Sequence, residues 1–190
     1  MFRKNLMWLV IGLVVAALLA GCKKQLSPYE PAPTQAPSSQ IYYTQFSLFQ
    51  EKNTYRTTNY RKGILIPINT EVTLQAMRGD EADLRLVDGG QILTIENVPK
   101  HTLDDMQTAF NKIVGPSKVD MKAFSQTERD AIMAGRVVKG MSRKAVLAAI
   151  GYPPKHETPS LEANDWVYWS NRFNRFVVHF KNDKVESVVE

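Results

Sequence analysis

The chain contains one cysteine, Cys22, and this scarcity restricts its chemistry. A single cysteine cannot form an internal disulfide or supply a zinc or iron–sulfur cluster built on thiolates. The three histidines, His101, His156 and His179, do not have the HxxxH or HExxH spacing of zinc sites. No GxSxG elbow, Walker loop or dinucleotide-binding motif occurs either. The sequence therefore predicts a protein that is not an enzyme and that holds no metal or cofactor.

A large excess of one charge is also absent. The chain has 24 basic and 19 acidic residues, a net charge of +5. Arg3 and Lys4 belong to a segment that we expect to be removed, which leaves 22 basic residues against 19 acidic ones, about +3. Nucleic-acid binding needs a concentrated basic face, so we expect no nucleic-acid partner. Attraction to anionic lipid or to a cell-wall polymer stays open.

The hydrophobic run at residues 6–20 is too short to span a membrane as a helix. At about 1.5 Å per residue, a helix of this length falls short of the roughly 30 Å hydrocarbon core. A positive start, a short apolar run and small residues before Cys22 are instead typical of a secretory signal.

The end of this run, Leu19-Ala20-Gly21-Cys22, resembles the lipobox of bacterial lipoproteins. The resemblance implies a signal peptide at 1–21, cleavage between Gly21 and Cys22, and acylation of Cys22, whose lipid chains anchor the protein to a bilayer. An ordinary signal peptide or an anchor helix with an incidental cysteine is the alternative. The lysines at 23 and 24 resemble enterobacterial signals for outer-membrane sorting, or they simply contact anionic headgroups. We expect a protein anchored to the outer membrane and facing the periplasm.

Residues 22–40 form the predicted tether. Residues 25–40 contain four prolines and almost no apolar side chains, a composition that favours extended polyproline II structure. At about 3.1 Å per residue, these sixteen residues reach about 50 Å.

Residues 41–116 are predicted to form a small β-barrel-like block with a trailing helix. Short segments rich in β-branched and aromatic residues are typical of strands; they lie at 42–46, 64–66, 72–76, 82–87 and 91–95. Glycines at 79 and 89–90 indicate tight turns. The stretch 63–72, with Pro67 and Thr70, resembles part of the bacterial Src-homology-type barrels. An apolar stripe predicts a helix from Leu103 to Val114, with Thr102 as its N-cap.

Residues 117–190 are predicted to form an ααβββ two-layer domain, which makes the fold class α+β. Ser125 and Glu128 have the spacing of a capping box, Ser142 suits the start of a second helix, and Gly151 suits its left-handed end. Three strands at 165–170, 175–180 and 184–189 predict an antiparallel sheet. Its inner face buries three side chains beneath the helices: Phe176, Val178 and Phe180.

One pattern in this domain resembles a known family. It consists of Gly140-Met141-Ser142-x-x-x-Val146-x-x-x-Ile150-Gly151-x-Pro153, then Trp166-x-Tyr168, a strand ending in Phe180 and a Val-rich last strand. Roughly residues 130–190 resemble the SmpA/OmlA family, the BamE-like outer-membrane lipoproteins. The resemblance implies a binding module and a partner in the β-barrel assembly machinery. The extra β-rich block departs from the family, whose members are little more than this domain.

The segment joining the first two of these strands carries the candidate contact residues Arg172, Phe173 and Arg175. An aromatic ring between two arginines suits a lipid interface or the binding surface of a partner protein. Alternatively, Phe173 folds over the sheet edge and the arginines only keep the turn soluble. The sequence thus predicts a membrane-anchored periplasmic binding or scaffold lipoprotein that assists outer-membrane protein assembly or envelope integrity. Rival hypotheses are a cell-wall-binding lipoprotein, an enzyme-inhibitor-like lipoprotein and an envelope hydrolase.

Overall fold

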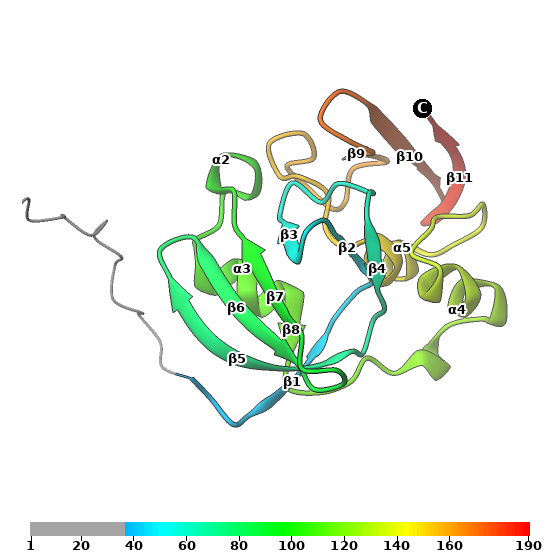
Figure 1. The fold of residues 1–190 in the computed structure, drawn as a ribbon. Coiled ribbons are helices and arrows are strands. Elements are labelled where there is room, and N and C mark those ends of the chain that lie inside the picture. Colours follow the sequence, from blue (N-terminus) through cyan, green and yellow to red (C-terminus); the bar gives the residue numbers. More distant parts are fainter. Residues whose placement is uncertain (1–36) are drawn as a thin grey trace, which may run out of the picture. The chain divides into compact units, whose positions relative to one another are not determined.

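The structure is a computed structural model that describes residues 37–190 (Figure 1). The predicted signal peptide, the cleavage site at Gly21, the lipidation residue Cys22 and most of the tether lie outside the described residues. The described part combines helices and strands, and the α+β prediction is confirmed.

Six strands of the first half form a curled half-barrel sheet in the order β3-β7-β6-β5-β1-β8 (Figure 1). These strands are β1 (Ile41–Thr44), β3 (Thr54–Arg56), β5 (Glu71–Arg78), β6 (Glu81–Leu86), β7 (Ile92–Glu96) and β8 (Val114–Gly115). Neighbouring strands are antiparallel, except that β3 and β7 run parallel. The remaining strands of this half, β2 (Leu48–Gln50) and β4 (Ile64–Ile66), pair separately. The sequence did not indicate β2, β3 or β8.

The half-barrel has its own hydrophobic core, which is filled by alternate side chains along each strand. Along β5 the side chains of Val72 and Leu74 are fully buried, and Leu84 on β6 is buried opposite Leu74. Helix α3 (Met106–Ile113) packs Phe110 against this core. The predicted turn between β5 and β6 is confirmed, with Gly79 at a φ of +51° that favours glycine.

The helix predicted from Leu103 to Val114 is wrong at its start. A separate four-residue helix, α2 (Pro99–Thr102), precedes it and ends at Leu103, whose left-handed φ of +57° stops the helix. Leu103 is 61% exposed and does not belong to the apolar face. Asp105, and not Thr102, is the N-cap of α3, because its carboxylate accepts a hydrogen bond from the Thr108 N–H at 2.7 Å. Thr102 is instead the last residue of α2, and its hydroxyl donates to the Asn97 side-chain oxygen at 3.0 Å.

The second half follows the predicted order of two helices and three strands (Figure 1). The elements are a short 3-10 turn η2 (Met121–Ala123), α4 (Gln126–Met133), α5 (Arg143–Ile150), β9 (Asp165–Trp169), β10 (Arg175–Lys181) and β11 (Lys184–Val189). The three strands form an antiparallel sheet in the order β11-β10-β9, which confirms the prediction. Phe176, Val178 and Phe180 are buried in one core with α4 and α5, as predicted.

The caps of both helices centre on one carboxylate. Ser125 and Glu128 form the predicted capping box of α4. The second oxygen of Glu128 accepts hydrogen bonds from the N–H and the hydroxyl of Ser142, both at 2.9 Å, and Ser142 caps α5. Gly151 ends α5 with a φ of +72°, but its ψ of −165° lies outside the predicted left-handed helical region.

The two halves share packing and hydrogen bonds, and the described residues belong to one compact unit. Ile68, from the first half, is buried in the core of the second. The Ser47 hydroxyl donates to the Ile132 carbonyl at 2.7 Å and accepts from the Ile68 N–H at 3.1 Å. Buried Asn59 donates to the Ile150 carbonyl at 2.5 Å. These contacts bury polar groups with partners from the other half, so neither half completes its packing alone.

Candidate functional site

The β9–β10 hairpin ends in a tip, residues 170–174, that projects one aromatic ring into solvent. Phe173 is 82% exposed, more than any other large hydrophobic residue among residues 37–190. The Asn171 side-chain oxygen accepts hydrogen bonds from the N–H groups of Phe173 at 2.9 Å and Asn174 at 3.1 Å. The Ser170 N–H also donates to the Asn174 carbonyl at 2.9 Å. These bonds fix the backbone of the tip, so the ring is presented from a well-defined turn.

The two arginines of the hairpin have different surroundings. Arg175 lies 3.4 Å from a Glu157 carboxylate oxygen, and its guanidinium sits 5.5 Å from the Trp169 ring centre. Arg172 has no carboxylate partner within the described part of the chain, and its guanidinium lies 5.7 Å from the Phe173 ring centre. The alternative in which Phe173 folds over the sheet edge is wrong, because its ring is exposed. Arg172 and Phe173 together form the free surface of the tip.

A basic groove of 430 Å³ continues from Arg172 onto the first half of the chain. Its walls come from β2, β3 and the residues that follow them; they are Phe49, Glu51, Lys52, Thr54, Arg56, Tyr60, Lys62 and Arg172. Lys62 pairs with Glu51 at 3.0 Å. Lys52 and Arg172 have no carboxylate partner among residues 37–190, so the groove has a net positive charge.

Arg61 supports both the groove and the hairpin from beneath. Its N–H donates to the Ser170 carbonyl at 3.2 Å, and its guanidinium donates to the Gly135 carbonyl at 2.7 Å. The guanidinium also lies 4.5 Å from the Phe49 ring centre. Burial lowers the pKa of Arg61 to about 10, although Tyr55 and Tyr168 oppose the shift. The side chain therefore stays charged at neutral pH and positions the hairpin against the first half.

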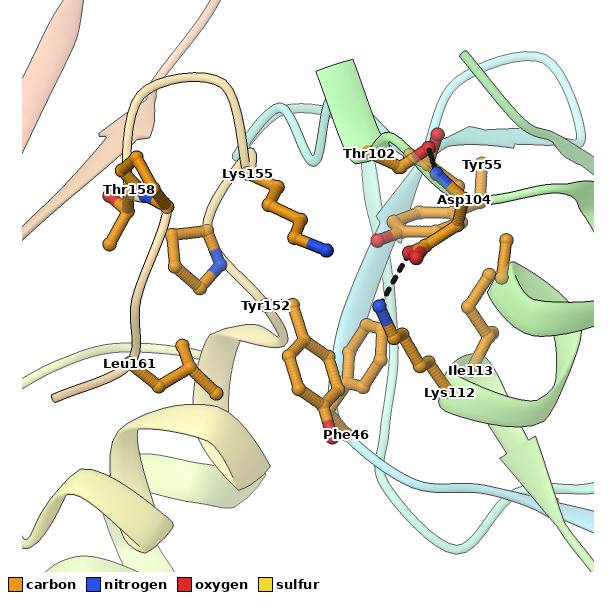
Figure 2. A pocket seen from close by; sticks show the side chains of 14 residues that line it. Phe46, Tyr55, Thr102, Asp104, Lys112, Ile113, Tyr152, Lys155, Thr158 and Leu161 are labelled. Atoms are coloured by element: carbon orange, nitrogen blue, oxygen red, sulfur yellow. Dashed lines mark hydrogen bonds and ion pairs between the residues drawn. The ribbon is translucent and has the colours of Figure 1, made fainter. Parts of the chain in front are cut away.

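A second cavity, which we call the loop pocket, lies between α3 and the loop at 152–161 (Figure 2). It has a volume of 230 Å³ and walls that are mostly apolar. Lys112 pairs with the Asp104 carboxylate at 2.5 Å, and its amine lies 5.5 Å from the Tyr152 ring centre. Figure 2 shows the Lys155 side chain extending into the same space toward this ion pair. Nothing in the sequence indicated this pocket, because its walls come from three separate segments of the chain, 46–57, 102–113 and 152–161.

The fold brings together two histidines that the sequence separates. The ring centres of His101 and His156 lie 4.5 Å apart, and His156 Nε2 lies 3.5 Å from a Glu157 oxygen. Burial lowers the pKa of His101, and His156 and Lys100 act in the same direction. His179 is paired elsewhere, with Asp165 at 2.7 Å. Within residues 37–190, no group of three or more His, Cys, Asp or Glu side chains is arranged to hold a metal ion.

The lipidation residue Cys22 and the cleavage site at Gly21 cannot be placed, since both lie outside the described residues. In the described residues, no helix is long and apolar enough to span a bilayer. Comparisons of the chain with protein-family models, with curated proteins and with solved structures found no match.

Proposed function

We propose that the protein is a lipoprotein of the bacterial outer membrane that binds a protein partner in the periplasm and acts as a scaffold. Acyl chains on Cys22 anchor it to the bilayer, and the proline-rich tether holds the folded part away from the surface. The hairpin tip then contacts the partner. The observation that carries this proposal is the 82% exposure of Phe173 beside Arg172, which has no carboxylate partner among residues 37–190.

An exposed aromatic ring next to an arginine is the usual composition of a binding hot spot. Leaving a phenylalanine in water forgoes about 2 kcal/mol of burial. Hydrogen bonds from Phe173 and Asn174 to Asn171 hold the turn in one shape, so little conformational entropy is lost when a partner covers the ring. These features favour a contact surface over a turn that only joins two strands.

A protein partner suits this surface better than a lipid surface. One ring and one free guanidinium give weak membrane binding, and Arg175 is already engaged by Glu157 and Trp169. The acyl chains supply membrane attachment without help from the hairpin. The basic groove beside Arg172 extends this contact surface. A complementary partner has acidic groups around an apolar recess that receives the Phe173 ring.

The resemblance of residues 130–190 to the SmpA/OmlA family supports a narrower form of the proposal. In that form, residues 117–190 are an SmpA/OmlA-like ααβββ domain, and the partner is a subunit of the barrel-assembly machinery. The block at 41–116 packs against this domain, and its residues Phe49 and Lys52, in and after β2, add a wall of the groove. The protein acts by contact, without catalysis.

Crosslinking in intact cells, followed by purification from detergent-solubilised membranes, tests the proposal. The double variant Arg172→Ala/Phe173→Ala is compared with the native protein. A hot spot contributes about 2 kcal/mol or more, so we expect a loss of partner affinity of roughly thirty-fold. Val87→Ala is the matched control, because Val87 is 48% exposed in a turn of the half-barrel and its loss should not affect binding.

Recovery of barrel-assembly subunits with the native protein and the control, but not with the double variant, supports the narrower form. Unchanged partner recovery with the double variant contradicts the assignment of the hairpin tip. Vesicles that contain phosphatidylglycerol test lipid insertion by the hairpin when the protein lacks its acyl chains; insertion predicts that the double variant then loses vesicle binding. Sedimentation with purified cell wall tests the rival cell-wall role.

A further inference from the structure

The loop pocket has the composition of a small-ligand site. Its apolar walls include the rings of Phe46, Tyr55 and Tyr152 and the aliphatic side chains of Ile113 and Leu161. At 230 Å³ it is smaller than the pockets of about 300–1,000 Å³ that hold drug-sized ligands. The pocket therefore fits one group about the size of an aromatic ring or a short alkyl chain.

The charges at this pocket favour an anionic ligand. Asp104 is balanced by Lys112 at 2.5 Å, and the Asp104 carboxylate is only 10% exposed. Lys155 is exposed and has no carboxylate or hydrogen-bond partner among residues 37–190. One ammonium thus remains uncompensated beside the apolar cavity, with its amine directed into the pocket (Figure 2).

The phenol of Tyr55 adds a hydrogen-bond donor. Burial raises its pKa, although the charge of Arg61 opposes the shift, so the group keeps its proton at neutral pH. Figure 2 shows the Tyr55 hydroxyl facing the same space as the Lys155 amine. A carboxylate accepts hydrogen bonds from both a phenol and an ammonium, whereas a cationic ligand is repelled by Lys155.

We infer that the loop pocket binds a small hydrophobic monocarboxylate, with the apolar group in the cavity and the carboxylate on Lys155. Free organic acids and the C-terminal residue of a peptide share this chemistry. This site lies apart from the hairpin tip, so the inference stands independently of the proposed partner contact.

Binding is measured by NMR on the full mature lipoprotein in phosphatidylcholine nanodiscs, with the Ile113 methyl group labelled as a reporter inside the pocket. The probes are 3-phenylpropionate, its neutral amide 3-phenylpropionamide, and acetyl-glycyl-phenylalanine with a free carboxylate. We expect saturable shifts of the Ile113 signal with the acids and at least ten-fold weaker binding of the amide.

The variant Lys155→Met keeps the length of the side chain and removes its charge. It should weaken acid binding at least ten-fold and leave amide binding unchanged. Lys139→Met is the control, because Lys139 is also exposed and unpaired within the described part of the chain but lies outside the pocket. The Phe173→Ala variant should bind the acids normally, which separates this site from the hairpin.

Tighter binding of the peptide than of 3-phenylpropionate assigns the site to chain termini, and the reverse order assigns it to free acids. The inference is overturned if no probe shifts the Ile113 signal saturably. Equal affinity for acid and amide, or native affinity in Lys155→Met, overturns it as well.

Discussion

Replacing Glu128 by glutamine should destabilise the protein by an amount that depends on pH. Partial burial by itself raises the pKa of this carboxyl, but hydrogen bonds from Ser142 and Ser125 outweigh that effect and lower it from 4.5 to about 2. Each serine donates through both its N–H and its hydroxyl, at 2.9–3.0 Å. The side chain is 11% exposed, so solvent screens these bonds little. The carboxylate therefore joins the starts of α4 and α5.

The size of the effect follows from the shift in pKa. A decrease from 4.5 to about 2 corresponds to about 3 kcal/mol of stability when Glu128 is ionised. Because the pKa is lower in the folded state, this stability is complete above pH 4.5 and is lost as the pH falls toward 2. In Glu128→Gln one carboxylate oxygen is replaced by an amide N–H₂, which cannot accept a hydrogen bond. The N–H and hydroxyl of the serine that faces this group therefore lose their acceptor. We expect Glu128→Gln to cost about 3 kcal/mol at pH 7.

Urea denaturation between pH 7 and pH 2, followed by far-ultraviolet circular dichroism, measures this difference. The gap in unfolding free energy between the native protein and Glu128→Gln should narrow as the pH falls from 4.5 to 2. Glu162→Gln serves as the control, because Glu162 is exposed and its carboxylate has no partner among residues 37–190. A gap that stays constant with pH, or a cost below about 0.5 kcal/mol, would refute the reasoning.

Two further predictions concern the lipid anchor and the junction of the two halves. Cys22→Ser should prevent both acylation and cleavage, so the variant should keep residues 1–21 and be larger than the native protein, and mass spectrometry should find acyl chains on the native Cys22 peptide. An unchanged size in the variant, or a free, unprocessed thiol in the native protein, contradicts the lipoprotein proposal. Gly151→Ala should cost more stability than Gly89→Ala in urea denaturation. Both glycines have positive φ, but an added Cβ at Gly151 meets the Phe46 ring at 2.6 Å, whereas one at Gly89 meets nothing within 4 Å. Strain at positive φ costs about 1 kcal/mol, so equal losses mean that the Phe46 contact is unimportant.

The sequence by itself determined the elements whose signals are local. The Ser125–Glu128 capping box spans four residues, and the turn at Gly79 depends on the φ of one residue. Along β10 every second side chain is buried, and this period of two places Phe176, Val178 and Phe180 inside. In each case the signal that predicts the element lies within a few positions along the chain, where propensity and periodicity operate. The start of α3 was missed because Leu103 adopts a left-handed φ that separates α2 from α3, which the apolar stripe did not indicate.

The tertiary structure decided everything that depends on contacts between distant segments. The parallel pairing of β3 with β7 joins residues forty positions apart, and the Asn59 bond to the Ile150 carbonyl spans 91. The sequence placed Arg172 and Phe173 on one hairpin because they are neighbours in the chain, whereas the loop pocket unites Lys112 with Lys155 only in the folded chain. Such contacts form where distant surfaces fit together and where buried polar groups find hydrogen-bond partners. No local pattern of residues encodes that fit.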